Sequence, residues 1–227
     1  MNRFFTPLLR RVYVFFAAFL AVYLVLALVQ RSPWNKERLY AKLLSGQREA
    51  RLAAAAGLIQ LGAQDQLLRA LRARSPVARD LAENALWELW FRAAGDEAYE
   101  LTMKALRAVE KGDFAGGLNL LDKITAQYPR FAEGWNRRAK LYWQVGKYQE
   151  SLADCRKVVE LNPVHFAAWQ GIAMCQVHLG DVEAACQAVR KALQIKPHDG
   201  PARRFLRHCE DLLHPGSRRE AAREYQA

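Results

Sequence analysis

Residues 132–165 read AEGWNRRAKLYWQVGKYQESLADCRKVVELNPVH, and this stretch decides the fold. Apolar residues recur at helical spacing over about 132–145 and again over about 149–161. Gly146 lies between the two segments and permits the left-handed backbone of a tight turn. Pro163 lacks the amide hydrogen that would continue the second segment as a helix. The stretch therefore predicts one helical hairpin with a defined end.

The same turn and stop residues recur at an interval of thirty-four residues on both sides of this hairpin. The three series that share the interval are Gly112, Gly146 and Gly180; Pro129, Pro163 and Pro197; and Leu101, Trp135 and Trp169. Three residue types in phase indicate a repeat, because stacked helical hairpins keep one residue type at each equivalent position. The interval predicts three units, at 98–131, 132–165 and 166–199.

These residues resemble the tetratricopeptide repeat (TPR) family, in which an aromatic residue, small residues, a turn glycine and a closing proline follow one another in order. The middle unit carries Trp135, Ala139, Tyr142, Gly146, Tyr148, Ser151 and Pro163. The last carries Trp169, Ala173, Gly180, Ala185, Ala192 and Pro197, with Gln176 in place of the Tyr, and the first carries Leu101, Ala105, Gly112, Phe114, Gly117 and Pro129. The resemblance covers residues 98–199 and implies an all-α solenoid.

A closer likeness points to short bacterial and plastid-type members with an N-terminal targeting or anchor segment. The strings that carry it are ALWELW at Ala85, FAEGWNRRA at Phe131 and LNPVHFAAW at Leu161. This likeness implies no particular reaction.

The flanking segments are also predicted to be helical. In the region 31–97, RLAAAAGLIQL at 51–61 and RDLAENALWEL at 79–89 place Ala and Leu at helical spacing and resemble a HEAT-type helix pair that extends the stack. A capping helix is expected at 200–213, and residues 214–227 form a polar tail.

The N-terminal part contains an apolar stretch without charge, from Val12 to Val29. Eighteen helical residues reach about 27 Å, close to the thickness of bilayer hydrocarbon, so residues 12–30 are predicted to be a transmembrane helix after a basic tail at 1–11. The alternative is a cleaved signal peptide and an exported protein. The order of basic tail and apolar segment favours a single-pass protein whose C-terminal domain lies on the non-cytoplasmic side.

The net charge of +11 is concentrated near this segment. Residues 1–50 hold eight Lys or Arg against two Glu, whereas residues 51–199 hold twenty against seventeen acidic residues. A basic excess beside an apolar segment fits anionic lipid headgroups better than a groove for phosphates. No nucleic-acid partner is therefore predicted, since no binding motif accompanies the charge.

The sequence predicts no enzyme, cofactor, metal site or small-molecule substrate, because it contains no nucleophile motif, no Gly-rich phosphate loop and no metal-ligand spacing. Four cysteines without CxxC spacing lie in helical segments and are expected to be buried: Cys155, Cys175, Cys186 and Cys209. A redox or enzyme-accessory role is a second hypothesis, because Cys175 and Cys186 fall in one unit and could form a bridge in an oxidising compartment.

The functional surface is expected on the concave face of the stacked hairpins. By the family resemblance its residues are Tyr99, Thr102, Leu106, Val109, Glu133, Asn136, Arg137, Lys140, Trp143, Gln170, Met174, Val177 and His178. Arg137 and Lys140, near Trp143, form either a carboxylate-binding site with an aromatic shelf or a solvated basic face.

The resulting prediction is a membrane-tethered scaffold that holds a peptide or helix of a protein partner in this groove. An assembly factor or accessory subunit of a larger membrane complex is the alternative. Some TPR domains grip the C-terminal carboxylate of chaperones with Lys, Asn and Arg. This sequence departs from that clamp and is not expected to be such a receptor, since the corresponding positions hold Thr102, Leu106, Ala167 and Gly171.

Overall fold

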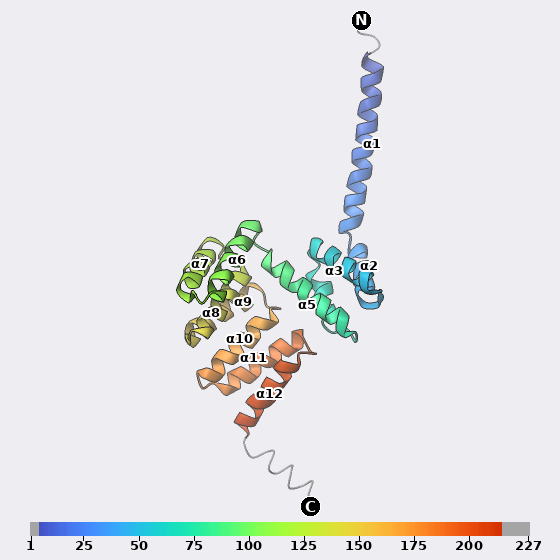
Figure 1. Cartoon of the computed structure of the whole chain (residues 1–227). Coiled ribbons are helices and arrows are strands. Elements are labelled where there is room, and N and C mark those ends of the chain that lie inside the picture. The colour runs from blue at the N-terminus through green and yellow to red at the C-terminus, as the bar shows by residue number, and fades with distance from the viewer. Residues whose placement is uncertain (1–4, 215–227) are drawn as a thin grey trace, which may run out of the picture.

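The computed structural model describes residues 5–214, and every regular element in this part of the chain is an α-helix (Figure 1). The polar tail predicted beyond His214 and the first four residues of the basic tail lie outside the described residues. The helices are α1 (Phe5–Arg31), α2 (Pro33–Ser45), α3 (Arg48–Gln60), α4 (Gln64–Ala70), α5 (Pro76–Phe91), α6 (Asp96–Glu110), α7 (Phe114–Gln127), α8 (Ala132–Gln144), α9 (Tyr148–Leu161), α10 (Phe166–His178), α11 (Val182–Ile195) and α12 (Gly200–Leu213).

Helix α1 projects away from the other helices, as Figure 1 shows. It begins at Phe5, so Arg10 and Arg11, expected as flanks outside a membrane span, are part of the helix itself. Within the described residues no helix combines the length and the apolar character that crossing a membrane requires. The predicted transmembrane helix at 12–30, and with it the single-pass membrane localisation, is therefore wrong.

The region between α1 and the repeats contains four helices rather than a single pair. The predicted segments correspond to α3 and α5, which pack on each other, while α4 lies between them in sequence and packs on α5. Ser32 and Ser75 accept hydrogen bonds from the first turns of α2 and α5, each of which has a proline at its start. The HEAT-type resemblance is not supported, because the inserted α4 and the preceding α2 share this core.

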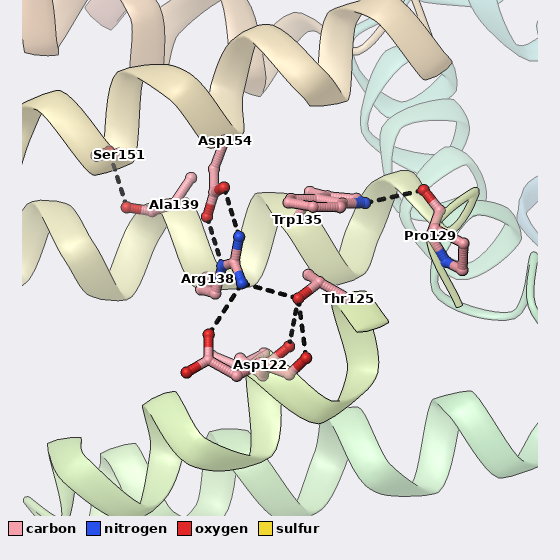
Figure 2. Close-up of polar contacts among 9 residues, drawn as sticks. Asp122, Thr125, Pro129, Trp135, Arg138, Ala139, Ser151 and Asp154 are labelled. Carbon is pink, nitrogen blue, oxygen red and sulfur yellow. Dashed lines mark hydrogen bonds and ion pairs between the residues drawn. The ribbon is translucent and has the colours of Figure 1, made fainter. Parts of the chain in front are cut away.

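The repeats form three hairpins, α6 with α7, α8 with α9 and α10 with α11. The turn glycines Gly112, Gly146 and Gly180 have φ values of +81°, +77° and +86°, which strain any residue with a Cβ. The Trp and Pro series are linked, because Trp135 Nε1 donates to the carbonyl of Pro129 at 3.0 Å (Figure 2). Trp169 Nε1 donates in the same way to the carbonyl of Pro163 at 2.8 Å. Each first-helix Trp thereby fixes the end of the preceding unit.

Arg138 joins three consecutive repeat helices. Its guanidinium donates to both carboxylate oxygens of Asp154 at 2.8 Å, to Asp122 at 2.9 Å and to Thr125 at 2.8 Å (Figure 2). Burial raises the pKa of Asp154, and Arg138 opposes this by stabilising the carboxylate. One bidentate pair therefore fixes α8 against α9, and the bonds to Asp122 and Thr125 connect α7 to the same guanidinium.

Helix α5 does not extend the row of hairpins. Its C-terminal half crosses to the repeats and contacts α8, and Phe166 at the start of α10 belongs to the buried core of α2–α5. At the other end of the array, α12 packs on α11 and buries Ala202 and Cys209. The N-terminal helices and the concave side of the repeats thus form one continuous packed unit.

Candidate partner-binding site

A cavity of about 480 Å³ lies where α5 crosses the first helices of the second and third repeats. Helices α8 and α10 supply most of its lining, and α5 and α9 supply the rest. The residues that line it are Trp87, Phe91, Asn136, Arg137, Ala139, Lys140, Trp143, Ser151, Cys155, Ala167, Gln170, Gly171 and Met174. In the described part of the chain, no acidic side chain faces this cavity.

Six of the thirteen predicted groove residues meet at this cavity: Asn136, Arg137, Lys140, Trp143, Gln170 and Met174. They come from two helices whose spacing along the chain is one repeat, and helical periodicity puts them on the same side of each helix. The resemblance thus led to residues that the fold brings together.

Three other predicted residues are placed differently. Thr102 is fully buried and donates to the carbonyl of Ala98 at 2.7 Å, so its position on an open groove face is wrong. Tyr99 packs against α5, with its ring 6.3 Å from the ring of Phe91. His178 is exposed and stacks on Tyr148 at 4.1 Å, outside the cavity lining.

Another predicted residue, Glu133, is fully buried beneath the cavity. Its carboxylate accepts from Asn136 at 3.2 Å and forms an ion pair with Arg137. His165 Nε2 lies 3.0 Å from Oε2, the same carboxylate oxygen that accepts from Asn136. Glu133 is therefore a structural anion that orients groove residues, and its carboxylate is not open to a partner.

Arg137 is occupied by contacts within the chain. Besides Glu133, its guanidinium lies 4.4 Å from the ring of Phe91 and 5.4 Å from that of Trp87, both on α5. Guanidinium groups in such stacked and paired sites are held strongly. The expectation that Arg137 receives a carboxylate from a partner does not fit this geometry.

Two hydrogen-bond donors at the cavity remain without a partner in the described structure. Lys140 is exposed, and the ion pairs of α8 involve its neighbours and leave it without one. Trp143 Nε1 is buried and has no hydrogen-bond acceptor among the described residues. A buried N–H without an acceptor costs on the order of 1–3 kcal/mol, and it is closed to a partner, so Lys140 is the donor that a partner can reach.

The edge of the cavity is fixed by a polar chain that reaches α5. Gln170 donates to Asp199 at 3.0 Å, and Lys196 bridges Asp199 at 3.1 Å and Glu83 at 2.7 Å. Burial alone would raise the pKa of Asp199, but hydrogen bonds from the Ala202 amide and Lys196 hold it below its usual range. Asp199 also accepts from the Ala202 amide as the N-cap of α12.

Sequence reasoning missed the wall that α5 contributes. Trp87, Trp90 and Phe91 lie at i, i+3 and i+4 in the string ALWELWF, a spacing that puts three aromatic rings on one helix face. That face docks on the repeats, with Trp90 stacked on His165 at 4.5 Å and Trp87 5.6 Å from Phe166. The aromatic triplet indicates that this face of α5 packs on another element. Its spacing does not show which helix that element is.

The four cysteines are free and buried, as expected from their positions in helices. Burial raises the pKa of Cys155 to about 12 and that of Cys209 to about 11. Cys175 lies 3.2 Å from the hydroxyl of Ser151 and is not bridged to Cys186. The structure therefore gives the redox hypothesis no activated thiol.

Comparison with known proteins identifies the repeat part of the chain. The sequence profile of the tetratricopeptide repeat matches residues 102–160 and 136–200. A TPR repeat-containing protein of Rhizobium etli is 31% identical over 151 residues, which are 66% of this chain and 74% of that protein. An SGT1 homolog of rice is 28% identical over 117 residues, but the match covers only 32% of its length and 51% of this chain.

Solved structures show the same fold at low identity. The first TPR domain of Spaghetti (RPAP3), bound to an HSP90 peptide, superposes with a TM-score of 0.50 at 22% identity and covers 51% of this chain and 92% of that one. The Sgt2 TPR domain of Aspergillus fumigatus gives 0.50 at 16% identity, with coverages of 54% and 82%. These matches do not support the closer likeness to anchored bacterial and plastid-type members. They confirm the predicted all-α solenoid, and together with the profile and the Rhizobium relative they place this chain in the tetratricopeptide repeat family.

Proposed function

We propose that this protein is a non-catalytic interaction scaffold that holds a segment of a partner protein in the cavity between α5, α8 and α10. One observation carries the proposal: the cavity is lined by apolar and polar side chains with the exposed, unpaired Lys140 among them, and by no acidic side chain. A segment that carries a carboxylate beside apolar side chains complements this lining.

The scaffold role agrees with what the family's hairpins provide, a concave surface built from first helices. In the described residues no group of three His, Cys, Asp or Glu is arranged to hold a metal ion. The polar groups at the cavity orient one another and are not arranged as a nucleophile with a base. Binding is therefore the function that this geometry supports best.

Two structural neighbours are described as bound to the HSP90 peptide SRMEEVD or an HSP70 peptide, which concerns those proteins. In this chain the expected clamp positions Ala167 and Gly171 line the cavity without a polar side chain, and Thr102 is buried. We infer that the partner is not recognised as a chaperone tail. Synthetic SRMEEVD is therefore not expected to bind in this cavity.

The direct test is site-specific photo-crosslinking in the native host. A benzoylphenylalanine residue in place of Met174 faces the cavity and is expected to capture a discrete partner. The same residue in place of Ala153, which is exposed on the outer helix α9, is the control position. A product that forms equally at both positions would contradict the proposal.

A charge variant links the captured partner to the cavity. Lys140→Glu is expected to reduce the Met174 crosslink at least tenfold, because the new carboxylate repels the carboxylate that the proposed partner carries opposite residue 140. Lys191→Glu makes the same change at an exposed position of α11 and is expected to leave the crosslink unaltered. Equal effects of the two substitutions would mean that net charge, and not this cavity, governs capture.

A further inference from the structure

Helix α5 lies outside the repeats, yet it closes one side of the cavity with two aromatic rings. We propose that Trp87 and Phe91 determine partner specificity, and that a large apolar side chain of the partner enters the cavity bounded by these rings and by Met174 of α10. The inference rests on the proposed function, since it assumes that a partner segment occupies this cavity. It adds the chemical class of the anchoring residue.

The aromatic wall is held firmly in place. Trp87 and Phe91 both pack on the guanidinium of Arg137, which is itself fixed by the buried Glu133. Behind the wall, Trp90 stacks on His165 and donates from Nε1 to Gln64 at 2.8 Å. A preorganised apolar surface of this kind binds an inserted side chain without an ordering cost of its own.

The opposite side of the cavity is lined by small residues. Ala139, Ala167 and Gly171 contribute little side-chain volume, and Met174 adds an adaptable apolar group. At Gly171 a Cβ would lie 2.7 Å from the sulfur of Cys155, so α9 and α10 approach closely there and only glycine fits without a shift. The small residues leave room for one large side chain.

The space between the two sides suits a single side chain. The cavity holds about 480 Å³ at the point where α5 crosses to the repeats. We therefore assign it to one large apolar side chain of a partner segment, whose backbone stays outside the cavity.

The test uses the full-length chain and a positional-scanning library of acetylated, amidated hexapeptides. We expect the wild-type protein to select Leu, Met, Phe or Trp at one position. Ala167→Leu, which fills the cavity, is expected to weaken binding of the selected pool at least tenfold. Ala153→Leu makes the same change on the exposed side of α9 and is expected to have no effect.

The wall itself is tested with conservative variants that keep the fold. Phe91→Leu and Trp87→Phe are expected to change which apolar residue is selected. As a folding control, the melting temperature of Ala167→Leu is expected to stay within a few degrees of the wild type. Selection of acidic residues alone, unaffected by Ala167→Leu, would overturn the inference and leave the proposed function standing. Absence of any selected pool would overturn it as well, and absence of a Met174 crosslink would overturn the proposed function itself.

Discussion

His165 and Glu133, from the two ends of the middle unit, face each other at 3.0 Å, with both side chains fully buried. The amide of Ala168 donates to Nδ1 of His165 at 3.2 Å, so that nitrogen carries no proton. Nε2 therefore carries the proton and donates to the carboxylate of Glu133. Because Trp90 stacks on the same imidazole, this one contact connects α5, α8 and the start of α10.

Trp90 is expected to be a main stabilising residue of the junction between α5 and the repeats. It is 4% exposed, and Trp90→Ala removes both its packing on His165 and its hydrogen bond to Gln64. A loss of about 3–5 kcal/mol in the free energy of unfolding is expected by urea titration. Trp34→Ala deletes the same side chain at a position that is 65% exposed and should change stability by less than about 1 kcal/mol.

If Trp90→Ala and Trp34→Ala proved equally mild, the close packing of α5 on the repeats would be wrong. A reduced m-value in Trp90→Ala would also be informative, because it would show that the N-terminal helices no longer unfold together with the repeats.

Glu133→Ala is expected to cost about 3–5 kcal/mol of unfolding free energy, since it leaves the half-buried Arg137 and the buried His165 without their acceptor. Glu133→Gln keeps one acceptor and should cost less. The matched control is Glu160→Gln, whose side chain is mostly exposed and pairs with Lys157. Urea unfolding at pH 7 checks the three variants, and equal costs for Glu133→Ala and Glu160→Gln would contradict a buried anion.

The repeat architecture was predictable because its signals are local. Gly146 and Pro163 act through backbone geometry, and the Trp series acts on a proline carbonyl only six residues earlier. The groove residues followed from helical periodicity once the repeat was known. Thr102 was misplaced because its hydroxyl bonds within its own helix, which spacing does not reveal.

The contribution of α5 was not predictable from a single sequence. Its contacts with Arg137 and Lys196 join residues more than forty positions apart, and no local pattern specifies which helix an aromatic face meets. The N-terminal segment shows a second limit of sequence patterns. The apolar stretch is visible in the sequence, but the pattern does not show that its helix begins at Phe5 and includes Arg10 and Arg11.

The cysteines are expected to be unreactive in the folded protein. Burial raises the pKa of Cys155 to about 12, so at pH 8 only about one thiol in ten thousand is ionised at that position. Titration with a disulfide reagent at pH 8 should detect four thiols after denaturation and almost none before it. Ala153→Cys, at an exposed position, is the control and should react within seconds to minutes. A rapidly reacting thiol in the native wild type would contradict the burial.

The pH dependence of stability should carry a contribution from Asp199. Its pKa is lowered in the folded protein, so the ionised carboxylate stabilises the fold above the ordinary value of 3.8, and this contribution is lost as the pH falls through the lower folded value. Asp199→Asn retains an N-cap for α12 but removes the ion pair with Lys196. The variant is expected to be about 1 kcal/mol less stable than the wild type at pH 7, with the difference shrinking progressively below pH 3.8. Asp96→Asn, on an exposed side chain beside Arg92, should show no such convergence. Urea titrations at pH 7, 4 and 3 measure both differences, and a gap between wild type and Asp199→Asn that stays constant down to pH 3 would show that the charge of Asp199 does not hold the edge of the cavity.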